Sequence, residues 1–302
     1  MFCVCVGRAG LPSVMLVYGG RLLCLCTVGM RVRCSGSVTR DTGVDYLNLY
    51  HLDWSTPNLW LAARDRPLII GHRGASAHAP ENTLLAFQTA REHGADGVEL
   101  DVTLCASGEV VVIHDDTVDR TTDGKGRVRD LSLAALRRLD AGQGQRIPTL
   151  DEVIAFTADW DPPFLLNIEL KPSLARRGAL AQAVVAVVRA AGCAARALFS
   201  SFDPLMVRRL ARLAPEIPRG ILYHHAMPAL LRRVWLGPLA PHEFRHPDIG
   251  LVAPAMVRRL KAQGKRVNTW TVNAPDQAAY AAACSVHGII SDSPRAIRPA
   301  LA

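Results

Sequence analysis

The stretch PLIIGHRGASAHAPENTLLAFQTAREHGADGVELDV, residues 67–102, contains the pattern that decides the fold. Its apolar run Leu68–Gly71 predicts a strand, and Gly97–Val102 predicts a second one. The stretch between them, Thr83–His93, has the spacing of an amphipathic helix. Two strands joined by a helix form a unit in which the strands run parallel and the helix covers the sheet. Residues 67–102 therefore predict an α/β protein.

The same alternation continues towards the C-terminus. Eight predicted strands within residues 67–302 favour a (β/α)8 TIM barrel over an open sheet. The link Thr103–Glu109 departs from this pattern, because it is too short to hold a crossover helix. The further strands are Val110–His114, Phe164–Leu170, Ala197–Phe202, Arg219–Tyr223, Arg266–Val272 and Gly288–Ser291; the further helices are Leu133–Leu139, Thr149–Ala158, Ala179–Ala191, Asp203–Ala214, Ala253–Gln263 and Pro275–Ala283.

The composition excludes several classes of protein. The chain has 302 residues, a formal net charge of +8 and 49% hydrophobic residues, which is typical of a globular chain and not of a disordered one. No apolar run reaches the ~20 residues that a membrane span needs. The positive charge comes mostly from dispersed arginines, without a dense stripe interleaved with aromatics, so we expect no nucleic-acid partner.

Three cysteines outside the N-terminal segment and one arginine-rich stretch bear on where in the cell the protein works. Cys105, Cys193 and Cys284 are scattered through the body, which favours a reducing compartment, and we expect a cytoplasmic protein. The stretch Leu230–Leu236 (LLRRVWL) mixes arginine with bulky apolar residues. A helix packed on the barrel is the simpler interpretation of this stretch, and peripheral contact with a membrane surface is the alternative.

The first 66 residues differ from the body. Five of the eight cysteines fall within the first 34 residues, mostly in C-x-C pairs without neighbouring histidines, which argues against zinc. We predict that residues 1–66 form a poorly ordered extension, dispensable for catalysis, next to a barrel domain over 67–302. A targeting or membrane-associating segment and a packed functional extension are the alternatives. Trp54 and Leu59–Leu61 offer apolar surface that would anchor against the bottom of the barrel.

Ionisable residues gather where the predicted strands end, which is the edge that carries the active site in α/β barrels. Glu99 and Asp101 are two residues apart on one strand, so both carboxylates face the same way and repel each other. With Glu169 from another strand they would form an all-oxygen site, which favours Mg²⁺ or Ca²⁺ over Zn²⁺. The alternative is that Arg73 and Lys171 neutralise these acids directly.

Two histidines, His72 and His114, end different predicted strands beside these carboxylates. A histidine titrates near neutral pH and suits general acid–base catalysis, although a histidine in an apolar strand often has only a structural role. Arg73 and Lys171 add fixed positive charge. Two cations, a metal ion and two proton-transfer groups are what phosphoryl chemistry needs, so we expect a phosphate-bearing small molecule as the substrate.

Short motifs follow one another along the body in a fixed order. They are Gly71-His72-Arg73-Gly74, Pro80-Glu81-Asn82-Thr83, Glu99-Leu100-Asp101-Val102, Val112-Ile113-His114-Asp115, Arg120-Thr121-Thr122-Asp123-Gly124, Ile147-Pro148-Thr149-Leu150-Asp151-Glu152, Asn167-Ile168-Glu169-Leu170-Lys171-Pro172, Ser200-Ser201-Phe202, Thr269-Trp270-Thr271-Val272-Asn273 and Gly288-Ile289-Ile290-Ser291-Asp292. Together, over about residues 67–298, they resemble the glycerophosphodiester phosphodiesterase family. The resemblance implies a TIM barrel with a small insertion after the third strand, about residues 117–146. It also accounts for the short link Thr103–Glu109 between the second and third predicted strands.

The resemblance also implies roles for individual residues. Three carboxylates would be metal ligands, two histidines would be the acid–base pair, and two cations would contact the phosphate. Glu81 and Asn82 would fix the first loop rather than take part in the chemistry, and Trp270 would form a wall of the pocket, with core packing as the alternative. The implied metal ligands are Glu99, Asp101 and Glu169, the acid–base pair is His72 and His114, and the phosphate contacts are Arg73 and Lys171.

The function that the resemblance implies is metal-dependent hydrolysis of glycerophosphodiesters to sn-glycerol 3-phosphate and an alcohol. A lysophospholipase D-like phosphodiesterase that acts on lipids is one alternative, since it would use the same headgroup chemistry. A non-catalytic barrel that binds phosphate ligands is another, and it predicts the loss of at least one key histidine or carboxylate, all of which are present. A metal-independent lyase would replace the carboxylates with basic residues and is disfavoured.

Overall fold

The computed structural model describes residues 57–171, 177–228 and 239–301, together with the backbone of three strands near the N-terminus. The chain divides into two compact units, residues 1–56 and 57–302. In the first unit, β1 (Phe2–Val6), β2 (Pro12–Tyr18) and β3 (Arg21–Cys24) form an antiparallel sheet with β2 in the middle. The predicted anchor residue Trp54 and the stretch Leu230–Leu236 both lie outside the described residues.

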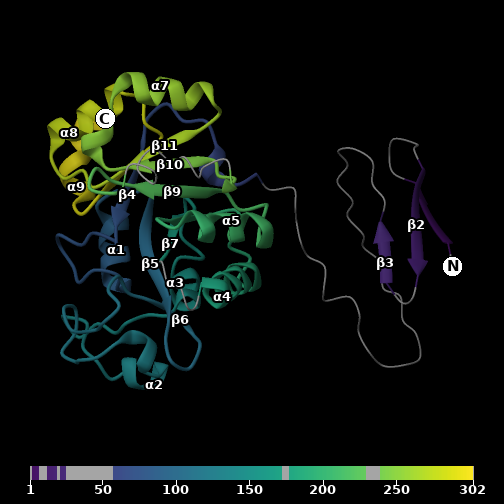
Figure 1. Cartoon of the computed structure of the whole chain (residues 1–302), viewed down its shortest axis with the longest axis horizontal. Coiled ribbons are helices and arrows are strands. Elements are labelled where there is room, and N and C mark those ends of the chain that lie inside the picture. Colours follow the sequence, from purple (N-terminus) through teal and green to yellow (C-terminus); the bar gives the residue numbers. More distant parts are fainter. Residues whose placement is uncertain are drawn as a thin grey trace. The chain divides into compact units, whose positions relative to one another are not determined.

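The second unit is a closed barrel of eight parallel strands, which confirms the predicted (β/α)8 fold (Figure 1). The barrel closes because the first strand pairs with both the last and the second, with Ile70 opposite Ile290 on one side and opposite Gly97 on the other. In their order around the barrel, the strands are β4 (Leu68–His72), β5 (Gly97–Leu104), β7 (Leu165–Leu170), β8 (Ala197–Ser201), β9 (Arg219–Tyr223), β10 (Phe244–Pro247), β11 (Arg266–Thr269) and β12 (Gly288–Ser291).

The predicted third strand, Val110–His114, is not a barrel strand. It contains β6 (Val110–Val112), which pairs antiparallel with the far end of β5 and places Val112 opposite Val102. The short link Thr103–Glu109 can form only a hairpin, and a hairpin reverses the chain direction. The missing barrel position belongs to β10, whose sequence Phe-Arg-His-Pro lacks the β-branched run by which strands are recognised.

Helices cover the outside of the barrel, and their first residues explain where they begin. The Thr83 hydroxyl accepts from the backbone N–H of Ala86, and Thr149 forms a capping box with Glu152. Val184, Val188 and Leu210 belong to the apolar core between the helices and the strands. The helices are α1 (Leu84–Glu92), α3 (Leu150–Phe156), α4 (Arg177–Ala190), α5 (Pro204–Leu213), α7 (Pro254–Ala262), α8 (Pro275–Ala283) and α9 (Pro294–Ile297).

The segment that follows β6 is the inserted one, and it has a small core of its own beside the barrel. It contains the short helix η3 (Val128–Asp130) and α2 (Leu133–Leu136), which is shorter than the predicted Leu133–Leu139. Val118, Val128 and Leu136 are buried together with residues of the β5–β6 hairpin. In Figure 1 this segment lies at the end of the unit where β5 and β6 extend. The insertion is therefore attached to the strand that continues from the barrel wall.

The bottom of the barrel is closed by an apolar layer that includes a residue from outside the predicted domain. Trp60, in η2 (Leu59–Leu61), is fully buried and packs edge-on against Phe244 with ring centroids 6.2 Å apart. Its Nε1 donates to the Arg196 carbonyl oxygen at 2.9 Å. The compact unit thus begins at Pro57, ten residues before the predicted start of the barrel domain at Pro67.

No helix among the described residues is both long enough and apolar enough to cross a lipid bilayer.

The buried Trp60 generates a test of where the folded unit begins. Trp60→Ala should lower the free energy of unfolding by about 3–5 kcal/mol, because it leaves a cavity at the barrel bottom. A chain that begins at Pro57 should unfold at the temperature of the full chain, whereas one that begins at Pro67 should unfold at a lower temperature. Thermal and urea unfolding measure both effects. Equal stability of the two shortened chains would show that Trp60 is not an anchor.

Two buried histidines, His242 and His246, and the half-buried His287 predict acid sensitivity. Burial lowers the pKa of His246 to about 3 and the pKa values of His242 and His287 to about 4. Well above pH 6.5 these histidines are neutral in both the folded and the unfolded chain. Below pH 6.5 the histidines of the unfolded chain become protonated, whereas those of the folded chain stay neutral until the pH reaches their lower pKa values. The free energy of unfolding should therefore fall as the pH is lowered from about 6.5 towards 4.

Urea unfolding at a series of pH values measures this dependence. His287→Gln should make the profile shallower, because it removes one of the three groups. A wild-type midpoint that stays constant between pH 6.5 and 4.5 would contradict the prediction.

Candidate active site

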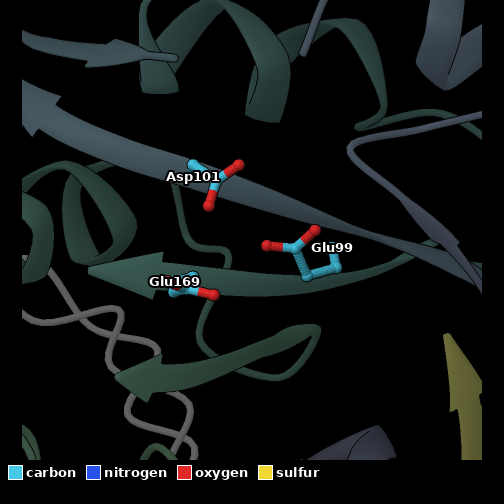
Figure 2. Close-up of side chains that lie close together, drawn as sticks. All are labelled: Glu99, Asp101 and Glu169. Atoms are coloured by element: carbon cyan, nitrogen blue, oxygen red, sulfur yellow. The ribbon is translucent and has the colours of Figure 1, made fainter. Parts of the chain in front are cut away.

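Three carboxylates meet at the carboxyl ends of two neighbouring strands. Glu99 and Asp101 lie on β5 and Glu169 on β7, as Figure 2 shows. The strand register places Asp101 directly opposite Glu169. One ligand oxygen from each residue lies within 4.8 Å of the other two, and no side chain of the three is more than slightly exposed. The three predicted metal ligands are therefore brought together in one buried cluster.

The cluster is electrostatically unfavourable without a cation. Burial, and then the charges of Asp101 and Glu169, raise the pKa of Glu99 well above its ordinary value. Burial also raises the pKa of Glu169. Among the described residues, the Oε1 atom of Glu99 is buried and has no hydrogen-bond partner. A buried polar atom of this kind needs a partner, and a divalent ion with oxygen ligands supplies one, so these residues fit Mg²⁺ or Ca²⁺.

Arg73 and Lys171 both contact the acids directly. The Lys171 Nζ donates to Asp101 at 3.1 Å and to Glu169 at 3.0 Å, and the Arg73 Nε lies 3.4 Å from the Asp101 Oδ2. Burial alone would raise the pKa of Asp101, but Lys171, His114 and Arg73 outweigh it and lower that pKa. When all three carboxylates are ionised, the two cations still leave one excess negative charge, which a divalent ion would reverse. A metal site at the cluster is therefore compatible with partial neutralisation of the acids by Arg73 and Lys171.

Each candidate catalytic histidine is held by a carboxylate on the same ring nitrogen. The Nδ1 of His72 lies 2.6 Å from the Asp292 Oδ1, and the Nδ1 of His114 lies 2.6 Å from the Asp115 Oδ1. A carboxylate can only accept, so Nδ1 carries the proton in both pairs. The Nε2 atom is then the one that exchanges a proton, and in His72 it lies 3.9 Å from the Glu99 Oε2. Both predicted histidines therefore have the second partner that acid–base work requires.

The loop after β4 needs an unusual backbone to serve this cluster. Arg73 and Gly74 have positive φ angles of 53° and 86°, and a Cβ on Gly74 would lie 2.6 Å from the backbone of Ala86. This turn lets the backbone N–H of Arg73 donate to the Glu99 Oε2 at 3.0 Å. Asn82, also with positive φ, donates its side-chain amide to the Asp101 Oδ2 at 2.9 Å. Asn82 thus holds a proposed ligand as well as the loop.

Asp292 is a site residue whose contact the sequence did not reveal. Besides His72, it accepts from the Ser76 hydroxyl at 3.0 Å and from the Asn273 amide at 2.6 Å. Burial raises the pKa of Asp292, but these hydrogen bonds, led by the one from His72, lower it to about 2. Asp292 follows the last strand, which closes the barrel against the strand that ends in His72. That adjacency exists only in a closed barrel.

Trp270 lies at the end of β11 and is half-buried. Its Nε1 donates to the His246 carbonyl oxygen at 2.9 Å, and its ring packs edge-on against Phe202 at 5.6 Å between centroids. His224 contacts both rings. Trp270 is therefore a packed residue at the rim of the barrel.

An α/β barrel with a cation-compatible acidic cluster and two carboxylate-held histidines belongs to the class of barrel hydrolases suited to phosphate esters. Residues 72–296 match the model of the glycerophosphoryl diester phosphodiesterase family, and the chain belongs to this family.

Relatives extend over nearly the whole barrel. A glycerophosphodiester phosphodiesterase from Caldanaerobacter subterraneus is 37% identical over 240 residues, which is 77% of this chain and 96% of the relative. A phosphodiesterase from Oleispira antarctica, solved in complex with the product sn-glycerol-3-phosphate, is 33% identical with a TM-score of 0.70, covering 78% of this chain and 96% of the other. An Agrobacterium tumefaciens glycerophosphodiester phosphodiesterase is 28% identical with a TM-score of 0.64, covering 78% and 98%.

The repulsion within the cluster predicts opposite effects with and without a cation. Glu99→Gln should raise the melting temperature of the metal-free protein by about 2–4 °C for each kcal/mol of relieved repulsion. In the wild type, Mg²⁺ or Ca²⁺ should raise the melting temperature by binding the folded state, and Glu99→Gln should lose most of this increase. Thermal unfolding in EDTA and in millimolar cation measures both effects.

Glu92→Gln, at an exposed position near the end of α1, is the matched control and should behave as wild type. A full cation-dependent increase in Glu99→Gln would count against a metal site at the cluster.

Proposed function

We propose that the chain hydrolyses glycerophosphodiesters to sn-glycerol 3-phosphate and an alcohol, using a divalent cation. The observation that carries this proposal is the buried cluster of Glu99, Asp101 and Glu169, with an unpartnered oxygen among the described residues, beside two carboxylate-held histidines. Family membership supports the reaction class. The relative with bound sn-glycerol-3-phosphate supports the glycerol side of the substrate.

The carboxylates of Glu99, Asp101 and Glu169 would hold the cation, Mg²⁺ or Ca²⁺. When bound, the ion supplies positive charge that stabilises the phosphate oxygens as negative charge develops on them. Asp101 is kept ionised by its contacts with Lys171 and Asn82, so it is ready to ligate without losing a proton.

Arg73 and Lys171 bind and orient the phosphate group. Both side chains are largely buried at the cluster, where a charged hydrogen bond is stronger than in water. Lys171 reaches two carboxylates and can offer its third N–H to an anion. Trp270 gives the rim a flat apolar wall against the substrate.

His72 and His114 move the protons. One histidine accepts a proton at Nε2 from the nucleophile, which is water or the glycerol 2-hydroxyl of the substrate. If the 2-hydroxyl attacks, the alcohol leaves and a cyclic phosphate forms, which water must then open to give sn-glycerol 3-phosphate. The other histidine donates a proton from Nε2 to the departing alkoxide as its bond to phosphorus breaks. The carboxylates on the two Nδ1 atoms hold each ring in place and stabilise its protonated form.

We further propose that the protein acts on a small-molecule substrate in the cytoplasm. Cys105, Cys193 and Cys284 are buried thiols, which suits a reducing compartment.

Release of sn-glycerol 3-phosphate from glycerophosphocholine and glycerophosphoethanolamine tests the proposed reaction. Activity should disappear in EDTA and return with Mg²⁺ or Ca²⁺. His72→Ala and His114→Ala should each lower kcat by about 10²–10⁴-fold, the usual contribution of a general acid or base. Thermal unfolding should confirm that both variants are folded. Full activity in EDTA and in His72→Ala would refute the proposal.

A comparison of glycerophosphocholine with lysophosphatidylcholine separates the proposed activity from the lipid alternative. We expect the water-soluble diester to be turned over with the higher kcat/KM. A preference for the lysophospholipid would make the chain a lysophospholipase D-like enzyme.

A further inference from the structure

Arg120, an arginine of the insertion, binds two carboxylates at once. Its Nη1 and Nη2 donate to the two carboxylate oxygens of Glu81, both at 2.8 Å. Its Nε and Nη2 donate to the two oxygens of Asp115 at 2.7 and 3.1 Å. The guanidinium group therefore makes a paired contact with each acid, the geometry for which arginine is suited and lysine is not.

Each of these acids leads to a different part of the active site. Glu81 also accepts from the Arg73 Nη1 at 2.9 Å, and Arg73 is the proposed phosphate contact. Asp115 also holds the Nδ1 of His114 at 2.6 Å. A continuous series of charged hydrogen bonds thus runs from Arg73 through Glu81, Arg120 and Asp115 to His114.

The segment that carries Arg120 is itself well held. Val118 is buried in the core of the insertion, and its backbone pairs with Gly126 at 3.0 Å. The Thr122 backbone N–H donates to the Val118 carbonyl oxygen at 3.1 Å, so the chain turns back on both sides of Arg120. A rigid base of this kind can fix the position of a half-exposed side chain.

We propose that Arg120 is a positioning residue that sets Arg73 and His114 in their working geometry together, and this rests on the proposed function of those two residues. Arg120 touches neither the carboxylate cluster nor a reacting atom. It acts by fixing the second partner of each group, and so it couples substrate binding to proton transfer. Through this one residue the insertion supports the active site.

The exposure and charge of Arg120, Glu81 and Asp115 support the positioning role of Arg120. The Arg120 side chain is 49% exposed, whereas those of Glu81 and Asp115 are only 19% and 27% exposed. Hydrogen bonds from Arg120 lead the lowering of the Asp115 pKa. Burial alone would raise the pKa of Glu81, but Arg120 and Arg73 together outweigh it and lower that pKa. Without Arg120, Glu81 would depend on Arg73 alone, and Asp115 on His114.

The test separates the two branches by kinetics. Glu81→Gln should mainly raise KM for glycerophosphocholine, because it frees Arg73, and Asp115→Asn should mainly lower kcat, because it frees His114. Arg120→Gln should do both, by roughly tenfold to a hundredfold overall, the size seen when outer partners of a site are removed. Arg120→Lys should restore only part of the activity, because an ammonium group cannot pair with both acids.

Double variants add a check on coupling. Glu81→Gln or Asp115→Asn combined with Arg120→Gln should cost less than the sum of the separate effects, since the groups share one network. Arg129→Gln is the matched control, because Arg129 lies in the same insertion and pairs only weakly, at 3.7 Å, with its neighbour Asp130. This control should keep wild-type kinetics.

A proton NMR measurement tests the His114 branch independently of turnover. The Nδ1–H proton of His114 should resonate far downfield in the wild type, and this resonance should shift or vanish in Arg120→Gln while the melting temperature changes little. Unchanged kinetics and an unchanged resonance in Arg120→Gln would overturn the inference. Failure of the wild type to hydrolyse any glycerophosphodiester would instead overturn the proposed function, and the resonance would still decide whether Arg120 positions His114.

Discussion

The repulsion among three buried carboxylates is the constraint on which the rest of the site depends. Register alone brings Asp101 beside Glu169 and puts Glu99 on the same face, so the barrel itself creates the conflict. The surroundings relieve it only in part: Lys171 and Asn82 favour the charged form of Asp101, while Glu99 keeps an oxygen that no described residue satisfies. The apolar layer below, closed by Trp60, gives the fold the stability to tolerate this cost.

Much of the fold, and which charged residues would lie together at the candidate site, could be predicted because both depend on local patterns. Apolar runs alternating with amphipathic stretches indicated the barrel, and charged residues at strand ends indicated where the chemistry lies. The errors arose where pairing direction or a short strand mattered. Val110–His114 has the composition of a barrel strand, but its hairpin link makes it antiparallel, and β10 is too short and polar to be recognised.

What could not be predicted are contacts between residues distant in the sequence. Asp292 meets His72 only because the last strand closes against the first, and Arg120 meets Glu81 only because the insertion folds back over the rim. Trp60 does pack at the barrel bottom, as the apolar content of Leu59–Leu61 predicted, but the start of the compact unit at Pro57 rather than Pro67 had no sequence signal. Burial and partner choice in these cases follow from tertiary packing, which no single-sequence pattern encodes.

The length of β5 has a consequence for how such enzymes can diversify. This strand carries Glu99 and Asp101 within the barrel and then continues as one arm of the hairpin that bears the insertion. Carboxylates and insertion are therefore joined by one continuous element, and the insertion cannot swing without bending the strand that holds the acids. Changes in the length or sequence of the inserted loops alter the pocket that they line beside Glu81 and His114, whereas the spacing of the acids remains fixed by the barrel.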